Sequence, residues 1–145
     1  MFKKLIPLFL LLLTLQGCAG VPGLIERPKV SVQDVSLHSL SLTGGTVLIH
    51  INLTNPNRFP LPLHGIQYSL NLNGRQVANG AQIQNRTINP LETVAVDIPV
   101  QMNMLELFQV APAILLNRRA AYDLSGAISL PLINVPFSRR GEIGV

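Results

Sequence analysis

The chain has 145 residues, 48% of them hydrophobic, and a formal net charge of +4. Its size is that of one domain, large enough to bury close to two-thirds of the surface that the unfolded chain exposes. It has no basic run longer than two residues and only 5% aromatic residues, so its composition excludes a nucleic-acid-binding protein.

The first 17 residues have the three-part layout of a secretory signal. Lys3 and Lys4 come first, and an apolar run follows from Leu5 to Leu15. This run is far shorter than the roughly 20 residues that a helix needs to cross a bilayer, so a permanent transmembrane helix is the weaker interpretation. We predict that residues 1–17 are a signal peptide that is removed on export.

The end of this signal resembles the lipobox of bacterial lipoproteins. Leu15, Gly17 and Cys18 fill the lipobox positions, with Cys18 as the residue that receives diacylglycerol. Gln16 departs from the pattern, because that position is more often small or β-branched. The resemblance implies a protein held on a membrane through the lipid anchor on Cys18. Ala19 follows where an inner-membrane retention signal has Asp, so we expect the outer membrane, facing the periplasm, if the host is Gram-negative.

Cys18 is the single cysteine of the chain, so no intramolecular disulfide can form and the domain depends on its core alone. Glycine and proline recur up to Pro28, and no hydrophobic period places this stretch inside a core. We therefore predict a signal peptide (1–17), a lipidated cysteine with a tether (18–28) and one β-sandwich domain (29–145). Because the tether is short, the domain is expected to work beside the membrane.

From Lys29 onward apolar and polar residues alternate, which is the pattern of strands with one buried face. After Gln33 and Asp34 the alternation changes phase, which predicts a β-bulge or a crossing between sheets. The apolar positions expected on the buried faces are Val30, Val32, Val35 and Leu37; Val47, Ile49, Ile51 and Leu53; Ile66, Tyr68, Leu70 and Leu72; Val94, Val96, Ile98 and Val100; Tyr122, Leu124, Ile128 and Leu130; and Ile133, Val135 and Phe137.

Prolines, asparagines and glycines mark where the strands end. Asn55-Pro56-Asn57 stops one strand, and Asn57 is expected in the left-handed region or bonded to its own backbone. Phe59 to Leu63 contains two prolines, which predicts an edge or connecting segment and not a central strand. Asn73-Gly74 predicts a type I′ hairpin turn with a return strand over 75–79. A polar segment over 82–89 is expected to lead to the next strand.

One helix is predicted, from Asn103 to about Asn117. Asn103 and Glu106 have the spacing of an N-cap and its reciprocal partner. Pro112 conflicts with a helical carbonyl, so we expect a kink or two short pieces. The residues expected in its apolar stripe are Met104, Leu107, Phe108, Ala111, Ile114 and Leu115. One helix among six to eight strands, with no βαβ alternation, predicts an all-β fold: a two-sheet antiparallel β-sandwich with one short connecting helix.

The turn and core residues together resemble the group-2 late-embryogenesis-abundant family, also called the water stress and hypersensitive response domain. The matching residues are Asn55-Pro56-Asn57, Phe59, Pro60, Pro62, Gly65-Ile66, Tyr68, Leu70, Asn73-Gly74, Val77, Gly80, Tyr122, Leu124, Gly126, Val135-Pro136-Phe137-Ser138 and Gly141. The resemblance implies a sandwich like a fibronectin type III or immunoglobulin module, and a role in desiccation, osmotic or envelope stress. It implies neither an enzymatic activity nor a cofactor.

The polar residues themselves predict no catalytic, cofactor-binding or metal-binding site. His38, His50 and His64 lie on separate predicted elements without metal-ligand spacing. Ser125 and Ser138 lack the context of a nucleophile elbow. Histidines that are solvated or hydrogen-bonded within the fold are therefore the favoured interpretation.

Two arginine pairs are candidates for contact with a membrane or a partner. Arg118 and Arg119 follow the predicted helix, where cations offset the negative end of the helix, so a structural role is favoured. Arg139 and Arg140 follow the last strand. Because the domain is expected close to a membrane, either pair could touch anionic headgroups or an acidic partner.

The favoured hypothesis is a non-enzymatic, membrane-anchored envelope lipoprotein whose sandwich binds or protects other components under desiccation or envelope stress. Its partners would be the membrane, through Cys18, and envelope proteins or lipids, but not nucleic acid. The alternative is a periplasmic carrier or sensor that holds a hydrophobic ligand, such as a lipid, between the helix near Phe108 and the sheets.

Overall fold

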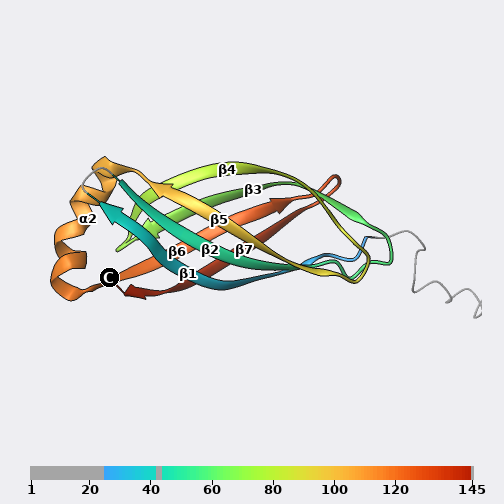
Figure 1. Cartoon of the computed structure of the whole chain (residues 1–145), viewed down its shortest axis with the longest axis horizontal. Coiled ribbons are helices and arrows are strands. Elements are labelled where there is room, and N and C mark those ends of the chain that lie inside the picture. The colour runs from blue at the N-terminus through green and yellow to red at the C-terminus, as the bar shows by residue number, and fades with distance from the viewer. Residues whose placement is uncertain (1–24, 42–43, 145) are drawn as a thin grey trace, which may run out of the picture.

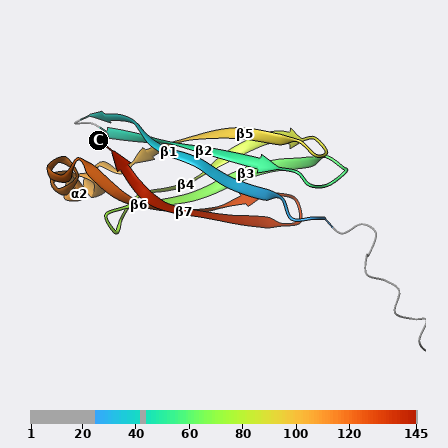
Figure 2. The same ribbon diagram turned by 90° about the horizontal axis from the view of Figure 1, so that it is seen from below.

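Seven strands and one helix make up the part of the chain that the computed structural model describes, residues 25–41 and 44–144. The elements are β1 (Lys29–Ser41), β2 (Gly44–Thr54), β3 (Leu61–Leu72), β4 (Arg75–Ile88), β5 (Thr93–Met102), α2 (Met104–Asn117), β6 (Arg119–Ser129) and β7 (Asn134–Gly144). One antiparallel sheet has the order β1-β2-β5 and the other β4-β3-β6-β7. The sheets form two layers with α2 at one end (Figure 1, Figure 2). The predicted two-sheet antiparallel β-sandwich is confirmed.

The core lies between the two sheets and follows the alternation in the sequence. The inward positions of β2, from Val47 to Leu53, and those of β5, from Val94 to Val100, are all buried as predicted. Burial of each such side chain contributes about 1.5–3 kcal/mol relative to exposure. Some of the predicted inward residues are only partly buried, namely Val30, Val32, Leu37, Tyr68 and Ile133.

Two local predictions about strand geometry are confirmed. The pairing of β1 with β2 shifts register between Val32 and Asp34, where the alternation in the sequence changes phase. The turn between β3 and β4 has positive φ at both Asn73 (48°) and Gly74 (80°), as a type I′ turn requires.

The segment with two prolines is in part a strand, because β3 begins at Leu61. β3 lies between β4 and β6, but its pairing with β6 begins only at Gly65. Pro62 therefore pairs with Thr87 of β4 alone, so its missing N–H interrupts no ladder on the second side. The prediction of an edge or connecting segment is confirmed for Phe59 to Leu63, although the strand that begins here becomes central from Gly65 onward.

The polar segment 82–89 is also strand and not a connection, since β4 continues to Ile88. Its residues pair with β3, for example Ile83 with Gly65 and Ile88 with Leu61. β4 is an edge strand, and most of its side chains in this half are exposed. The prediction was wrong because an exposed edge strand lacks the apolar alternation that marks a half-buried one.

The helix begins as predicted, but its expected capping box is incomplete. The Oδ1 of Asn103 accepts a hydrogen bond from the backbone N–H of Leu105 (3.0 Å), which confirms the N-cap. Glu106 does not bond back to Asn103. Its Oε2 instead accepts a hydrogen bond from Nη1 of Arg75 (2.9 Å), because the β3–β4 hairpin places Arg75 next to the first helical turn.

Two further features of α2 bear on the predictions. The helix runs without a break through Pro112, which excludes the alternative of two short pieces and leaves the expected kink a prediction. Its buried residues are Leu107, Val110 and Ile114, whereas Phe108 and Leu115 of the predicted stripe are exposed. Helical spacing alone did not identify which side of the apolar stripe would face the sheets.

Aromatic side chains of the four-stranded sheet pack against glycines of the neighbouring strands. The pairs are Tyr68 with Gly80, Tyr122 with Gly141 and Phe137 with Gly126. A Cβ at Gly126 would overlap both the ring of Phe137 and the carbonyl oxygen of Gln67. These residues, which all belong to the family resemblance, therefore have a packing role.

Candidate functional site

The two ends of the sandwich differ in chemistry, and each is a candidate site. We define the tether end as residues 25–28 with the β2–β3, β4–β5 and β6–β7 loops. We define the helix end as α2, the β3–β4 hairpin and the end of β1. Figure 1 and Figure 2 show the two ends at opposite extremes of the long axis.

Asn55 is fully buried at the tether end, and its side chain joins two loops. Its Nδ2 donates to the carbonyl oxygens of Phe59 (2.8 Å), Ile88 (3.2 Å) and Asn89 (3.2 Å). Its backbone N–H donates to the carbonyl of Glu92 (2.9 Å). A buried amide costs free energy unless it is hydrogen-bonded, and here the network satisfies it.

Asn57 holds the N-terminal segment onto the same end. Its Oδ1 accepts from the backbone N–H of Glu26 (2.7 Å), and its Nδ2 donates to the carbonyl of Glu26 (2.9 Å). Both its backbone N–H (2.9 Å) and its Nδ2 (3.1 Å) also donate to Oδ1 of Asn55. The chain is therefore fixed to the sandwich at Glu26. Sequence reasoning missed this contact, because the two residues lie 31 positions apart and only the paired asparagines hint at it.

Apolar side chains project from all three loops of the tether end. The exposed fractions are 40% for Phe59, 67% for Leu91 and 83% for Leu132. Leu91 has a φ of 57°, a conformation that is uncommon for residues other than glycine. Arg27 and Arg58 are exposed in the same segments. This end thus combines a rigid polar interior with apolar and basic side chains outside.

The helix end contains an apolar pocket of about 600 Å³ between α2 and the end of β1. Hydrocarbon groups make up nearly all of its lining, which consists of Leu40, Ser41, Met104, Leu107, Phe108, Ala111, Pro112, Ile114 and Leu115. No charged side chain lies among them. Its size and apolar lining are compatible with a hydrophobic ligand.

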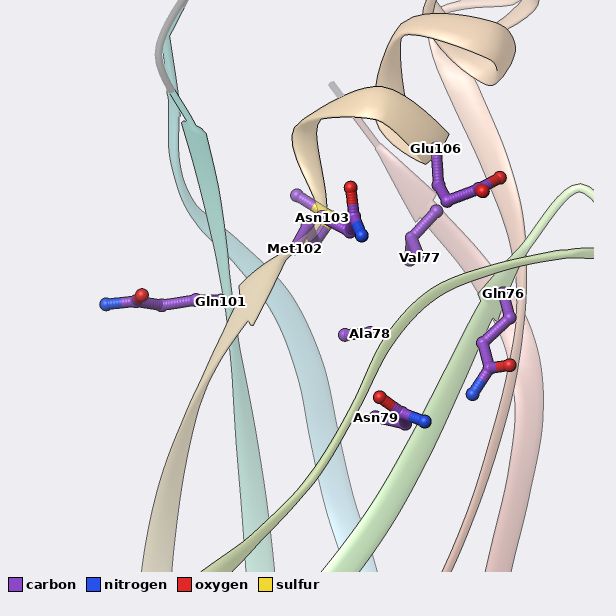
Figure 3. Close-up of a pocket in the computed structure, with 8 residues that line it drawn as sticks. All are labelled: Gln76, Val77, Ala78, Asn79, Gln101, Met102, Asn103 and Glu106. Carbon is purple, nitrogen blue, oxygen red and sulfur yellow. The ribbon is translucent and has the colours of Figure 1, made fainter.

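A cleft of about 570 Å³ near the start of α2 is polar (Figure 3). Its lining residues come from β4, the end of β5 and the first helical turn, and are Gln76, Val77, Ala78, Asn79, Gln101, Met102, Asn103 and Glu106. Half of them are amides, which donate and accept hydrogen bonds. Figure 3 shows that Gln101 points away from the other residues. The lining therefore suits hydrogen bonding to a polar molecule.

The arginine pair after the helix lies at the helix end. Arg118 is the C-cap residue and has a left-handed backbone, with a φ of 51°. Arg119 begins β6, and its Nη1 lies 3.6 Å from Oε2 of Glu142 on β7. Both arginines are exposed. Their contact with a membrane or partner stays a prediction.

The second pair lies on β7, along the side of the sandwich and not at either end. Nη1 of Arg139 donates to the carbonyls of Val32 and Gln33 (3.0 Å to Gln33), at the bulge of β1. Nε of Arg140 donates to Oδ2 of Asp123 (2.8 Å) on β6. Arg139 thus joins the edges of the two sheets. The structure does not bring the four arginines together into one basic surface.

The histidines lie on separate strands, and one has an acidic partner. Nδ1 of His50 lies 2.6 Å from Oδ1 of Asp97, on the solvent face where β2 pairs with β5. Within residues 25–41 and 44–144, no three His, Cys, Asp or Glu side chains gather as metal ligands would.

The predicted lipobox, Leu15 to Cys18, lies outside the described residues, as does most of the tether. The helix that the structure does describe, α2, is not long and apolar enough to cross a membrane.

Comparison with known proteins identifies relatives along most of the chain. The family model described as "Late embryogenesis abundant protein" matches residues 50–141. The chain is 30% identical over 124 residues to the "Desiccation protectant protein Lea14 homolog" of Glycine max, covering 82% of each chain. It is 27% identical, with the same coverage, to the "Probable desiccation-related protein LEA14" of Arabidopsis thaliana.

Solved structures share the fold. A solution structure of an Arabidopsis thaliana protein has a TM-score of 0.72 at 24% identity, and the match covers 88% of this chain and 89% of the other. A crystal structure of an Archaeoglobus fulgidus protein has a TM-score of 0.61 at 15% identity, covering 83% and 96%. These likenesses, like the alternation in the sequence, support a β-sandwich.

Proposed function

This chain belongs to the late embryogenesis abundant protein family, and from that membership we propose that it is a non-enzymatic, lipid-anchored protein of the bacterial envelope that protects its neighbours during desiccation. The names of the plant relatives refer to desiccation, and this supports the stress role. The signal and the lipobox-like Leu15-Gln16-Gly17-Cys18 support the anchor.

The geometry of the tether end is the observation that favours an anchored protein most. The N-terminal segment is bonded to buried Asn57 at Glu26, eight positions after Cys18. Eight residues span at most about 29 Å when fully extended. A lipid on Cys18 would therefore hold the sandwich next to the bilayer, with α2 at the far end (Figure 1).

Protection without catalysis requires a surface that can replace water. The cleft beside α2 presents amides such as Gln76 and Asn79, which offer both donors and acceptors. Polar groups of a neighbouring molecule that lose water could hydrogen-bond to these amides, which carry no charge to desolvate.

The anchor is tested by Cys18→Ser. We expect this variant to lose metabolic labelling with palmitate, because serine has no thiol to accept diacylglycerol. The protein should then either leave the membrane fraction in soluble form or accumulate with its signal peptide uncleaved. Ser36→Ala, a change in β1, serves as the control and should leave both measurements unchanged. Equal labelling of Cys18→Ser and the unaltered protein would contradict the anchor.

The stress role is tested by survival. Cells lacking the protein should survive drying and rewetting less well than cells that regain it, and Cys18→Ser should restore less survival than the unaltered protein. Survival that does not depend on the protein would exclude the protective function, whatever the result for the anchor.

A carrier or sensor of a hydrophobic ligand is the second candidate, and the apolar pocket between α2 and β1 favours it. In this case the protein purified from membranes should release a lipid into organic solvent, since a bound ligand is extracted whereas the covalent anchor stays. Ala111→Trp places a large ring in the pocket and should abolish this release. Gln109→Trp, on an exposed position of the same helix, is the matched control. Extracts free of lipid would remove the carrier hypothesis.

A further inference from the structure

We propose that the tether end is a bilayer-docking surface, in which Phe59, Leu91 and Leu132 enter the interface of an anionic phospholipid membrane. The proposal rests on the anchor proposed above. The three exposed residues belong to three different loops. These loops lie at the end of the sandwich where the N-terminal segment joins it (Figure 1, Figure 2).

Leu91 is held by a hydrogen-bonded support. Leu91 is exposed and has a left-handed backbone. Its N–H donates a hydrogen bond to the carbonyl of Asn57 (3.2 Å). Asn57 in turn bonds Asn55 and Glu26. A bulky residue in this conformation is unfavourable and requires support from its surroundings. The buried network therefore holds an apolar side chain outward instead of letting it collapse onto the core.

The charges at this end suit an anionic surface. Arg27, Lys29 and Arg58 are exposed, and Glu26 and Glu92 are the acidic residues nearby in sequence. The carboxylate of Glu92 accepts a hydrogen bond from the backbone N–H of Asn89 (2.8 Å), so it is directed at its own loop. Arginine and lysine near a bilayer are attracted to anionic headgroups.

Distances favour docking through the tether end. The 11 residues of β2 span about 36 Å at 3.3 Å each. The chain from Cys18 to Glu26 spans at most about 29 Å. With Cys18 in the bilayer, the domain cannot stand upright on its helix end, because Glu26 would then lie further from the bilayer than this stretch of chain can reach. The tether end is held within reach instead, and such confinement raises the effective concentration so that a few apolar side chains suffice.

Docking of this kind would also orient the molecule. The long axis of the domain would point away from the bilayer. The apolar pocket beside Phe108 would then face the periplasm and not the lipid. The exposed leucines of the two ends would then have different surroundings although their exposure in the protein is alike. This difference can be measured.

The test uses single tryptophans, since the chain has none. The full-length lipidated protein, as L132W or L91W, is reconstituted in vesicles of phosphatidylethanolamine and phosphatidylglycerol with brominated acyl chains, and L116W is the control. Leu132 is 83% exposed and Leu116 is 84% exposed, so the two positions are matched. We expect a blue shift and quenching for L132W and L91W, and neither for L116W.

The outcomes separate docking from anchoring. Vesicles that float with the protein, and that quench L132W and L91W but not L116W, support the docking surface. Floating protein in which L132W and L116W are quenched equally, or not at all, overturns docking and leaves the anchor in place. Protein that does not float with the vesicles overturns the anchor and the docking with it.

Discussion

The tether end and the helix end both expose apolar side chains, but the side chains buried beneath them differ. At the tether end the buried polar residues are Asn55 and Asn57, whose amides bond to backbone groups of three segments. At the helix end Leu107, Val110 and Ile114 pack onto the sheets without directional bonds. Hydrogen bonds specify one geometry, whereas apolar contact tolerates repacking. This difference predicts a tether end of constant geometry and a helix end whose packing can adjust.

Loss of the amide at the tether end should have the largest effect on stability. Asn55→Ala leaves three buried or half-buried carbonyls and Asn57 without their partner, so we expect a loss of about 3–4 kcal/mol in the free energy of unfolding. Urea unfolding followed by circular dichroism measures it. Asn85→Ala, on exposed β4, should change stability by less than about 0.5 kcal/mol. Equal effects of the two substitutions would contradict the structural role of Asn55.

An apolar truncation at the helix end should cost less. Leu107→Ala removes a buried side chain next to an existing pocket, and we expect a loss of about 2–3 kcal/mol, because the site can relax. Leu116→Ala, on the same helix but exposed, should lie within about 0.5 kcal/mol of the unaltered protein. Should Leu107→Ala prove more damaging than Asn55→Ala, the contrast between a rigid and an adaptable end would be lost.

The ion pair between Arg75 and Glu106 should contribute least. Its N–O distance is 2.9 Å, but the two side chains are 47% and 36% exposed, so solvent screens the attraction. Arg75→Ala should lower the free energy of unfolding by less than about 1 kcal/mol, and added salt should shrink the difference. A salt-independent loss of several kcal/mol would show that this hairpin supports the helix end more strongly than its exposure indicates.

Strands with one buried face, and the local features between them, were predictable from the sequence. The inward residues of β2 and β5, the bulge of β1, the Asn73-Gly74 turn and the N-cap Asn103 all depend on neighbours within a few positions. The exposed half of β4 was missed, because an edge strand needs no apolar alternation. The two prolines correctly indicated a segment with at most one neighbour, but not that it continues into the central part of β3, because proline is excluded from a strand only where that strand has two neighbours.

The candidate sites depended more on long-range contacts. The sequence indicated a helix near Phe108 able to line an apolar site, but not that Phe108 and Leu115 would lie outside the buried face and border a pocket. The four arginines were predicted as two pairs. Three of them bond partners within the fold, and Arg139 bonds to carbonyls more than a hundred positions away.

The sequence by itself determined the β-sandwich class, the family and the residues that alternate into the core, since each of these follows from local order along the chain. Only the tertiary structure decided that the side chain of Asn57 would hydrogen-bond to the backbone of Glu26. It also decided that the loops with Phe59, Leu91 and Leu132 would share one end while α2 occupies the other. The reason is physical: strand periodicity is set by adjacent residues, but the ends of a sandwich are assembled from loops that the chain order separates.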